Sequence, residues 1–390
     1  MKTLFTQRHA LVWSALFGLA LDSLPAQAQQ AGLTSIKNGG NTLDDGGVHV
    51  DAHGGNVLLD PKSGKYHWFG EYRGTPRGVG CYSSQDLYNW KKERIAMTAE
   101  EAGLVGMVFE RPKVVYNALT NKYVMWYHHD TKNYGAAELG VAVSDNVAGP
   151  YIMIRHFRPN GHESRDFGIF TDDDGKVYVF YSSKGNSEIR VVELTPDFQN
   201  VTTRDAVTGS HCEGEGIMKY NGIYYLIASG CAGWTPNPGT YATATDIMGP
   251  WTQRGNPMID DVNRNMFASQ PTFILKVQGY EKGYLYMGDR WNGGGSTRSQ
   301  YIWLPIVIPR DNVMELRYQA EWNLSVFGAV SIMGAKGRLR ETTPAGWIIG
   351  QGVPLFTSGS TSYNPLGRQR LSPNMRFLPL PARHFPEGKK

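Results

Sequence analysis

The chain has little cysteine, no long helical hydrophobic pattern and no strong excess of either charge. Its three cysteines are Cys81, Cys212 and Cys231, and no group of residues has the spacing of zinc ligands. The formal net charge is only +4 in 390 residues, without the interleaved basic and aromatic residues typical of nucleic-acid-binding surfaces. We therefore expect no helical bundle, no bound metal among the site residues and no nucleic-acid partner.

The first 28 residues have the pattern of a secretory signal peptide. Two basic residues precede an apolar run over residues 10–20, and residues 24–28 offer a small-x-small cleavage site. The apolar run is too short for a membrane anchor, so no membrane partner is expected. The sequence thus predicts a secreted or periplasmic protein, with a disordered N-terminus as the alternative. In an oxidising compartment, Cys212 and Cys231 could form a disulfide.

One phrase, a small turn residue followed by an aromatic-rich strand, recurs five times. Neighbouring copies lie roughly 45 to 60 residues apart, which is the length of one propeller blade. Short strands and polar turns follow each copy, as in antiparallel hairpins. The copies span residues 64–71, 121–128, 175–182, 221–228 and 282–289. This pattern predicts an all-β fold, a five-bladed β-propeller over residues 29–326 with about four strands per blade.

The segment 327–390 differs from the repeats. It lacks the aromatic phrase and is rich in Gly, Pro, Ser and Arg. Such a composition favours a partly disordered C-terminal extension. The alternative is that scattered apolar residues, such as Trp347, let the segment wrap the propeller.

Carboxylates at strand ends are candidates for one shared active site. A propeller can bring such groups from different blades to a central pocket. Glycoside hydrolysis uses a carboxylic acid to protonate the leaving oxygen and usually a second group on the opposite face. The candidates are Glu110, Asp166, Glu213 and Glu215. Because Glu213 and Glu215 alternate along a strand, we expect them to point the same way and one pKa to rise.

Each candidate has a structural alternative. Glu110 could form an ion pair with Arg111 or Lys113, and either of the two neighbouring glutamates could simply be solvated. The acidic segment 172–175 looks like part of a calcium loop but lacks the further ligands of that motif. A solvated hairpin turn is the better interpretation, because Asp and Gly suit turn geometry.

In combination, several motifs resemble those of glycoside hydrolase family 43, and within it the exo-β-1,3-galactanase subfamily. The resemblance runs from about residue 46 to residue 326. The motifs are Ala52-His53-Gly54-Gly55, Trp68-Phe69-Gly70-Glu71, Glu110-Arg111-Pro112-Lys113-Val114, Asn133-Tyr134-Gly135-Ala136-Ala137, Ser164-Arg165-Asp166, Ser229-Gly230-Cys231-Ala232-Gly233-Trp234, Ser269-Gln270, Gly288-Asp289-Arg290-Trp291 and Trp303-Leu304-Pro305. It implies a five-bladed propeller that hydrolyses glycosidic bonds with inversion. We expect a monomer acting on a polysaccharide or oligosaccharide, without a cofactor; a structural calcium ion stays open.

The resemblance also implies roles for individual residues. Glu213 matches the general acid by its spacing to a downstream lysine, although Glu215 stands where the subfamily has a proline. Glu110 and Asp166 match acids that hold galactose hydroxyls and tune the general acid. Gln270 matches the residue that orients the attacking water, or deprotonates it as an imidic acid. The substrate-binding candidates are Glu71, Tyr134, Asp51, Trp234, Asp289 and Trp291.

Three positions depart from the subfamily pattern. Asp51 stands where a neutral residue is usual, and it could restore the aspartate base that most of family 43 uses. Lys184 and Ala232 replace a common Glu and a common Thr, which could shift the preference away from galactan. These departures leave open the release of arabinofuranose or xylose by the same fold. The missing standard aspartate base leaves open a catalytically silent carbohydrate-binding propeller.

Overall fold

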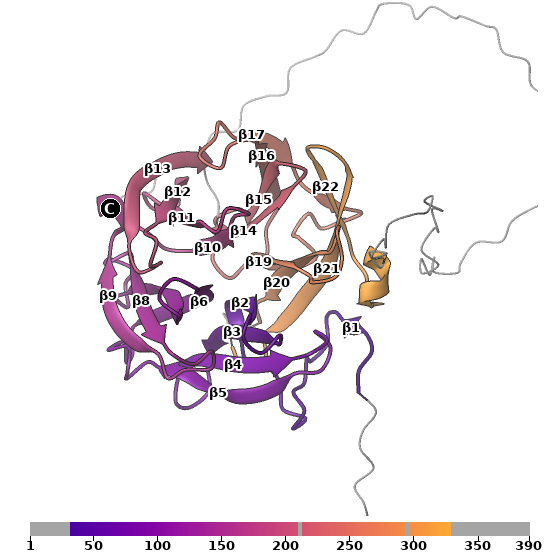
Figure 1. Cartoon of the computed structure of the whole chain (residues 1–390). Helices are drawn as coiled ribbons and strands as arrows, with labels where there is room; N and C mark the ends of the chain where they lie inside the picture. Colours follow the sequence, from indigo (N-terminus) through magenta and orange to yellow (C-terminus); the bar gives the residue numbers. More distant parts are fainter. Residues whose placement is uncertain (1–31, 210–212, 293–295, 329–390) are drawn as a thin grey trace, which may run out of the picture. The chain divides into compact units, whose positions relative to one another are not determined.

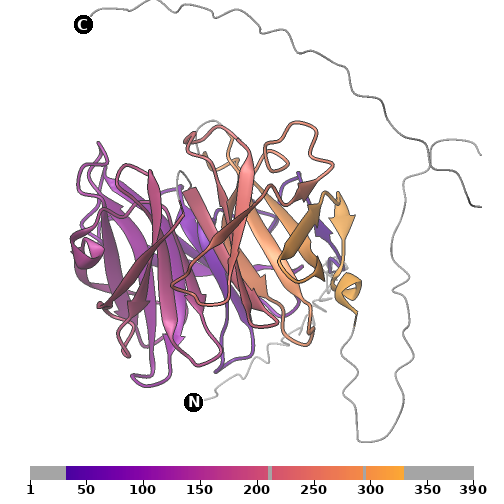
Figure 2. The same ribbon diagram turned by 90° about the horizontal axis from the view of Figure 1, so that it is seen from above.

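The computed structural model describes residues 32–209, 213–292 and 296–328. Within these ranges, five sheets follow one another along the chain and surround a common axis (Figure 1). Figure 2, turned by 90°, shows their strands running between the two ends of the propeller. The predicted five-bladed β-propeller is therefore confirmed. The proposed signal peptide, Cys212 with its expected disulfide, and the extension beyond residue 328 lie outside the described residues.

Four blades contain four strands each, and the fifth has an additional outer strand that pairs in parallel. Blade 1 contains β2 (His53–Leu59), β3 (Tyr66–Tyr72), β4 (Gly78–Ser84) and β5 (Lys91–Thr98); blade 2 contains β6 (Val108–Asn117), β7 (Lys122–Asp130), β8 (Glu138–Ser144) and β9 (Ile152–Phe157). Blade 3 contains β10 (Phe167–Thr171), β11 (Val177–Ser183), β12 (Glu188–Leu194) and β13 (Val201–Gly209); blade 4 contains β14 (Glu213–Tyr220), β15 (Ile223–Ser229), β16 (Gly239–Ala244) and β17 (Thr252–Gly255). Blade 5 contains β19 (Gln270–Lys276), β20 (Tyr284–Arg290), β21 (Gln300–Arg310), β22 (Val313–Arg317) and the outer β18 (Met258–Ile259). The described helices are two 3-10 turns, η1 (Pro159–Gly161) and η2 (Leu324–Phe327).

The recurring aromatic phrase forms the second strand of every blade, namely β3, β7, β11, β15 and β20. Successive side chains of a strand point to opposite faces, so each phrase can pack against both neighbouring blades. In β3, the ring of Trp68 packs against Trp90 and Trp303, with centroids 5.2 and 4.6 Å apart. The next residue, Phe69, packs on the opposite side in a cluster that includes Phe109 of blade 2. The phrase therefore supplies the apolar layers between blades.

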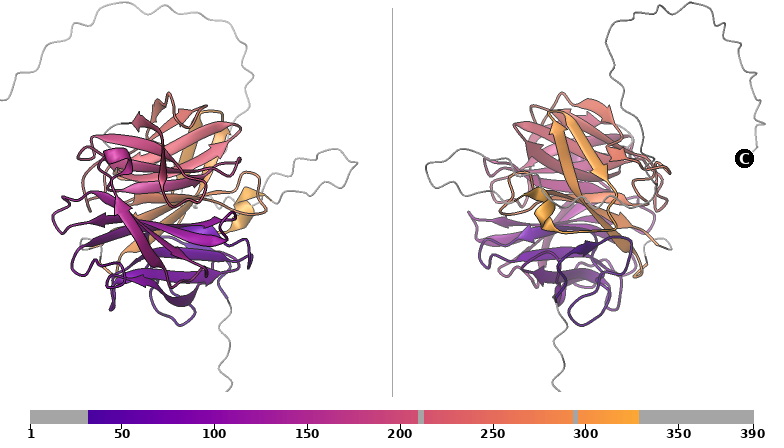
Figure 3. Two further views of the ribbon diagram at one scale, coloured as in Figure 1. Left: turned by 60° about the vertical axis from the view of Figure 1, so that its left-hand side comes forward. Right: turned by 90° about the vertical axis from the view of Figure 1, so that its right-hand side faces the viewer.

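The N-terminal segment joins the first blade to the last. Strand β1 (Ile36–Lys37) pairs with β23 (Glu321–Trp322). Asn38 adds three bonds, because its Nδ2 donates to the carbonyls of Trp303 and Gln319 (both 2.8 Å) and its Oδ1 accepts from the Trp303 amide (2.7 Å). Figure 3 shows the first and last blades side by side. In the described ranges, no helix has the length and apolar character needed to cross a membrane.

The innermost strands β2, β6, β10, β14 and β19 lie next to one another around the axis. Each begins an antiparallel hairpin, so its first residues lie opposite the last residues of the second strand. The pairs include His53 with Glu71, Glu110 with His128, Glu213 with Ser229, and Gln270 with Asp289. This topology gathers polar side chains from several blades at one end of the propeller.

Substituting Gly55→Ala is expected to destabilise the propeller strongly. A Cβ at this position would lie 1.6 Å from the Phe69 carbonyl oxygen and 2.7 Å from the Gly70 Cα. Both atoms belong to the backbone of β3, so no rotamer change relieves the clash. We expect a loss of at least about 3 kcal/mol and a Tm lower by roughly 6 °C or more in thermal unfolding. Gly40→Ala is the control, since its Cβ would meet nothing within 4 Å; equal Tm shifts would contradict this account.

Candidate active site

A cavity of about 350 Å³ lies where these strand ends meet. All five blades contribute to its lining. The lining residues are Glu71, Glu110, Arg111, His128, Tyr134, Arg165, Asp166, Asn186, Glu213, Gly233, Trp234, Gln270 and Trp291. The cavity therefore brings together every predicted site residue except Asp51, Glu215 and Asp289.

A larger cavity, of about 500 Å³, lies between the N-terminal segment and blades 1 and 5. Its carboxylates are Asp44 and Asp45. Asp44 Oδ1 already accepts bonds from the amides of Gly46 and Val48, at 3.0 and 2.9 Å, so it serves the local turn. The convergence of acids from several blades favours the smaller cavity as the reaction site.

Glu213, the first residue of β14, is the carboxyl group best suited to donate a proton. Its Oε1 accepts a bond from Asn186 Nδ2 (2.7 Å) and its Oε2 accepts one from Gln270 Nε2 (3.3 Å). Burial, followed by the neighbouring Asp166 carboxylate, raises the pKa of Glu213 to about 7 against the opposing charge of Arg111. A carboxyl group with this pKa is still protonated in many molecules near neutral pH, as a general acid must be.

The amide of Gln270 is held in one orientation by four contacts. Its Oε1 accepts from Arg111 Nη2 (2.5 Å) and Trp291 Nε1 (2.8 Å), while its Nε2 donates to Glu213 Oε2 and Ser229 Oγ, both at 3.3 Å. Because Arg111 and Trp291 can only donate, the atom of Gln270 that they contact is the amide oxygen. Gln270 therefore presents a rigid polar group beside Glu213 in a nearly buried position.

Arg111 links the residues on opposite sides of the cavity. Besides Gln270, its Nη2 pairs with Asp166 Oδ2 at 2.7 Å, and its backbone amide donates to Glu71 Oε1 at 3.2 Å. A β-bulge in β6 between Glu110 and Lys113 interrupts the ladder at this point. Bulges redirect side chains near active sites, and here one lies where both Glu110 and Arg111 reach the cavity.

Glu110 lies in a charged chain rather than in either of the ion pairs considered from the sequence. Its Oε2 is 3.7 Å from His128 Nδ1, and His128 Nε2 is 3.0 Å from Asp130 Oδ2. Burial alone would lower the pKa of His128, but the two carboxylates outweigh it and raise the pKa to about 9. Burial likewise opposes ionisation of Glu110, yet the bond and charge of His128 hold its pKa below the usual value. Tyr134 donates its hydroxyl to Glu110 Oε1 (3.2 Å), so an ionised acceptor faces the cavity.

An aromatic wall forms another side of the cavity. The rings of Trp234 and Trp291 meet edge to face with centroids 4.9 Å apart, and the Arg73 guanidinium lies 5.2 and 5.6 Å from their centroids. Arg73 also pairs with Glu71 Oε2 at 2.5 Å. Burial raises the pKa of Glu71 in spite of this ion pair. Trp234 is 39% exposed and offers an apolar face of the kind that stacks on sugar rings.

A sequence model of glycosyl hydrolases family 43 matches residues 61–297, more than half of the chain. The chain belongs to this family.

Solved structures of the family support the assignment. A family 43 β-1,3-galactosidase is 40% identical with a TM-score of 0.70, covering 75% of this chain and 64% of that one. An exo-β-1,3-galactanase from Phanerochaete chrysosporium, solved with β-1,3-galactotriose, is 33% identical with a TM-score of 0.68 over 75% of this chain and 68% of its own. A curated β-D-galactofuranosidase from Aspergillus niger is 26% identical over 188 residues, 44% of this chain and 54% of that protein. The chain thus spans just over half of this curated relative and less than two thirds of the first structure.

Glu215 differs from expectation, because it does not share the cavity with Glu213. A β-bulge interrupts β14 between Glu213 and Gly216, and Gly214 has a φ of +67°, so strand alternation fails here. Glu215 is fully buried and accepts a bond from Ser182 Oγ at 2.6 Å. Burial, with the Asp166 charge, raises the pKa of Glu215 well above its usual value. The group that raises the pKa of Glu213 after burial is Asp166, not its strand neighbour.

Asp51 and Asp289 also lie behind the cavity lining rather than in it. Asp51 Oδ2 accepts from the Arg73 amide (2.7 Å), and its Oδ1 is 3.2 Å from His53 Nδ1. Asp289 Oδ2 accepts from the Gly54 amide at 2.9 Å. Asp51 thus fixes groups within blade 1, and Asp289 of blade 5 fixes the backbone of blade 1. The structure therefore does not support direct contact of either carboxylate with the substrate, or a role for Asp51 as the base.

Several cavity residues of this family 43 protein were not singled out from the sequence: Arg111, His128, Arg165 and Asn186. Arg111 and Arg165 are adjacent to predicted acids, and His128 ends an aromatic phrase. Their positions in the sequence could therefore have identified them as candidates. Asn186 lies in the turn after β11 with a φ of +60°, a conformation that asparagine tolerates. Its contact with Glu213 depends on two blades meeting, which no local pattern reveals. Lys184 and Ala232 do not line the cavity.

The cavity shows no group of ligands for the calcium ion left open above. In the described ranges, one set of His, Cys, Asp and Glu side chains lies close enough to hold a metal ion, and it belongs to β7, β8 and β9 of blade 2. Near the axis, the fully buried Lys113 extends its Nζ to the Gly54 carbonyl and lies 3.4 Å from Thr272 Oγ1. Burial, followed by the charge of Arg111, lowers the pKa of Lys113 to about 7.

Proposed function

We propose that this protein is an exported, inverting exo-glycosidase that removes terminal galactose from β-1,3-linked galactan and arabinogalactan side chains. The observation that carries the proposal is the pairing of Glu213, with its raised pKa, and the fixed amide of Gln270 in one cavity. The similarity to a β-1,3-galactosidase and an exo-β-1,3-galactanase supports the choice of sugar. The signal-peptide pattern supports export.

In this mechanism, Glu213 protonates the leaving glycosidic oxygen while water attacks the anomeric carbon from the opposite face. The ionised Glu110, with Tyr134 and His128 around it, accepts hydrogen bonds from the hydroxyls of the terminal sugar. Asp166 keeps the pKa of Glu213 high and is itself held by Arg111. Gln270 orients the attacking water. Because its carbonyl oxygen already accepts from Arg111 and Trp291, the amide form is favoured over the imidic acid.

The first experiment is hydrolysis of debranched β-1,3-galactan, with the anomeric signals of the released sugar followed by proton NMR. Initial release of α-galactose supports an inverting exo-galactanase, since inversion converts a β-linkage into an α-product. Initial β-galactose would reject inversion. Release of arabinose or xylose instead would favour the alternative sugars, and oligosaccharide binding without hydrolysis would favour a carbohydrate-binding propeller.

The value of kcat/KM should fall above about pH 7, because kcat/KM reports the ionisation of the free enzyme. Glu213 must be protonated to act as the acid, and burial with the Asp166 charge raises its pKa to about 7. Raising the pH through this value deprotonates Glu213, so kcat/KM is expected to drop about tenfold per pH unit above it. The measurement is kcat/KM for β-1,3-galactobiose from about pH 4 to about pH 9. A kcat/KM that stays constant up to about pH 9 would contradict the assignment of Glu213 as the acid.

A further inference from the structure

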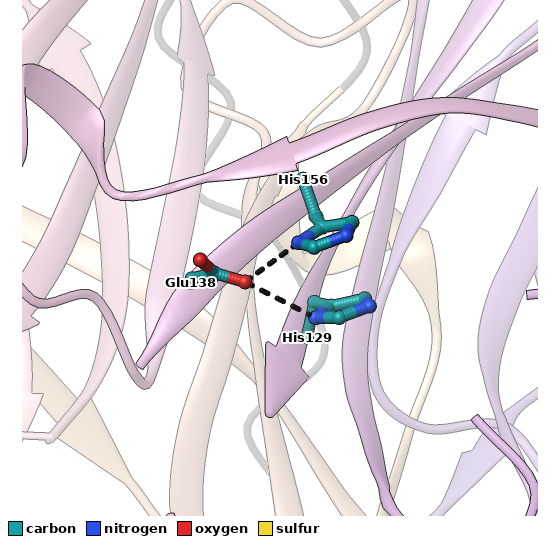
Figure 4. Close-up of side chains that lie close together, drawn as sticks. All are labelled: His129, Glu138 and His156. Atoms are coloured by element: carbon teal, nitrogen blue, oxygen red, sulfur yellow. Dashed lines mark hydrogen bonds and ion pairs between the residues drawn. The ribbon is translucent and has the colours of Figure 1, made fainter. Parts of the chain in front are cut away.

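Three neighbouring strands of blade 2 bring two histidines and a glutamate together, away from the cavity (Figure 4). His129 of β7 lies opposite Glu138 of β8 in the ladder, and His156 of β9 lies opposite Gly140, two residues further along β8. Opposed residues share a face of an antiparallel sheet, as do residues two apart on one strand. All three side chains therefore project from the same face.

The ligand atoms of the three residues converge. His156 Nδ1 is 2.6 Å and His129 Nδ1 is 3.5 Å from the same oxygen, Glu138 Oε2. The two imidazole rings stack with centroids 4.0 Å apart and an angle of 6°, and both Nδ1 atoms face the Glu138 carboxylate (Figure 4). One potential ligand atom from each residue lies within 4.8 Å of the others.

An ordinary ion pair accounts for only part of this arrangement. The bond between His156 and Glu138 satisfies one ring, but His129 Nδ1 is buried and has no hydrogen-bond partner among the described residues. If both stacked imidazoles were protonated, their positive charges would repel each other. A single cation that replaced these contacts would bind both neutral rings and the carboxylate, once the rings turn from their parallel stack so that the ion lies in the plane of each.

We propose that His129, His156 and Glu138 bind a divalent transition-metal ion of the Zn²⁺ class, through two imidazole Nδ1 atoms and one carboxylate oxygen. Two nitrogens and one oxygen are a ligand set that zinc accepts, with water completing the coordination. The side chain of His156 is 45% exposed, which leaves a path for the ion and for that water.

The site would clamp the loop that carries Tyr134. His129 is the second-last residue of β7 and Glu138 is the first residue of β8, so the two ligands stand at the two ends of residues 131–137. Tyr134, in this loop, donates to Glu110 in the cavity. A metal ion would tie both ends of the loop to β9. Binding is therefore expected to raise the Tm of the protein, because the folded chain holds the ligands together and the unfolded chain does not.

The test uses the full chain without an affinity tag, freed of metal with a chelator. Zn²⁺ is titrated by calorimetry, and Co²⁺ binding is followed by its visible absorption. We expect one ion per chain, a higher Tm with Zn²⁺, and a Co²⁺ spectrum with nitrogen and oxygen ligands. Zn²⁺ binding that is weak and does not saturate would overturn the proposal.

Variants assign the binding to these residues. His156→Ala removes a ligand at an accessible position and is expected to weaken Zn²⁺ binding at least about tenfold, and Glu138→Gln is expected to act in the same direction. His162→Ala is the matched control, because this histidine is similarly exposed (41%) and lies 3.8 Å from Asp205 instead. Cooperative thermal unfolding of metal-free His156→Ala, at a Tm close to that of the metal-free parent, reports that the variant is folded. Unchanged Zn²⁺ affinity in a folded His156→Ala protein would place the metal elsewhere and reject the site.

Discussion

Replacing Glu213 by Gln is expected to lower kcat on β-1,3-galactobiose by roughly a thousandfold, with KM little changed. The substitution keeps the size of the side chain and one accepting oxygen, for either Asn186 or Gln270, but it removes the proton that the leaving oxygen needs. An aryl galactoside whose leaving group needs no protonation should lose less than about tenfold. Steady-state kinetics on the two substrates therefore separate loss of the acid from loss of the fold.

Glu215→Gln is the matched control for this prediction. Burial raises the pKa of Glu215 well above its usual value, which favours the protonated form, and an amide resembles this form in size and charge. It lies outside the cavity lining, bonded to Ser182. We expect less than about a tenfold loss of kcat. The opposite pattern, with Glu215→Gln inactive and Glu213→Gln active on galactobiose, would exchange the roles of the two glutamates.

The fold was predictable because the repeated phrase is local. Each copy carries its own turn residue and alternating aromatic side chains. Neighbours in the sequence, such as Trp68 and Phe69, belong to the two apolar clusters on opposite faces of the blade. The number of blades then follows from the number of copies. The additional parallel strand β18 was not predictable, since its two residues carry no periodic signal.

Three of the four acids that the strand-end pattern selected line the cavity. Glu110, Asp166 and Glu213 line the cavity as expected. Glu215 does not, because the bulge that follows Gly214 breaks the alternation on which its prediction depended. Asp51 lies outside the lining for a different reason. Its Oδ2 accepts from the Arg73 amide and its Oδ1 lies 3.2 Å from His53 Nδ1, so its carboxylate is taken up within the first hairpin of blade 1. The strand-end pattern does not show which acids are used in this way by their own hairpin.

The charge balance of the cavity explains why one carboxyl group can stay protonated among several acids. Arg111 pairs with Asp166, and His128 pairs with Glu110 and Asp130, so these acids have cationic partners. Glu213 accepts bonds from the amides of Asn186 and Gln270, which carry no charge. Burial therefore acts on Glu213 with less compensation, and its pKa rises to about 7.

Replacing Gln270 by Ala is expected to lower kcat by at least about a hundredfold. The substitution leaves Arg111 Nη2 and Trp291 Nε1 without the oxygen that they share, and it removes the group beside Glu213 that would orient water. Initial rates on galactobiose, with Tm measured in parallel, separate this loss from unfolding. A variant that keeps more than about a third of kcat would show that the water is oriented by another group.

Gln270→Glu provides the decisive comparison, because it keeps an oxygen for Arg111 and Trp291 while placing a second carboxylate next to Glu213. A neighbouring negative charge favours the protonated form of Glu213, so its pKa should rise further. The alkaline limb of the pH profile should therefore move to higher pH in Gln270→Glu. In Gln270→Ala we expect no such rise in the pKa of Glu213, because no negative charge is added.

The two variants should also differ in activity. If Gln270 orients the attacking water, Gln270→Glu should retain more activity than Gln270→Ala, since a carboxylate can accept the proton of that water. Equal loss of activity in both variants, with no movement of the alkaline limb, would reject the role of Gln270 in orienting the water.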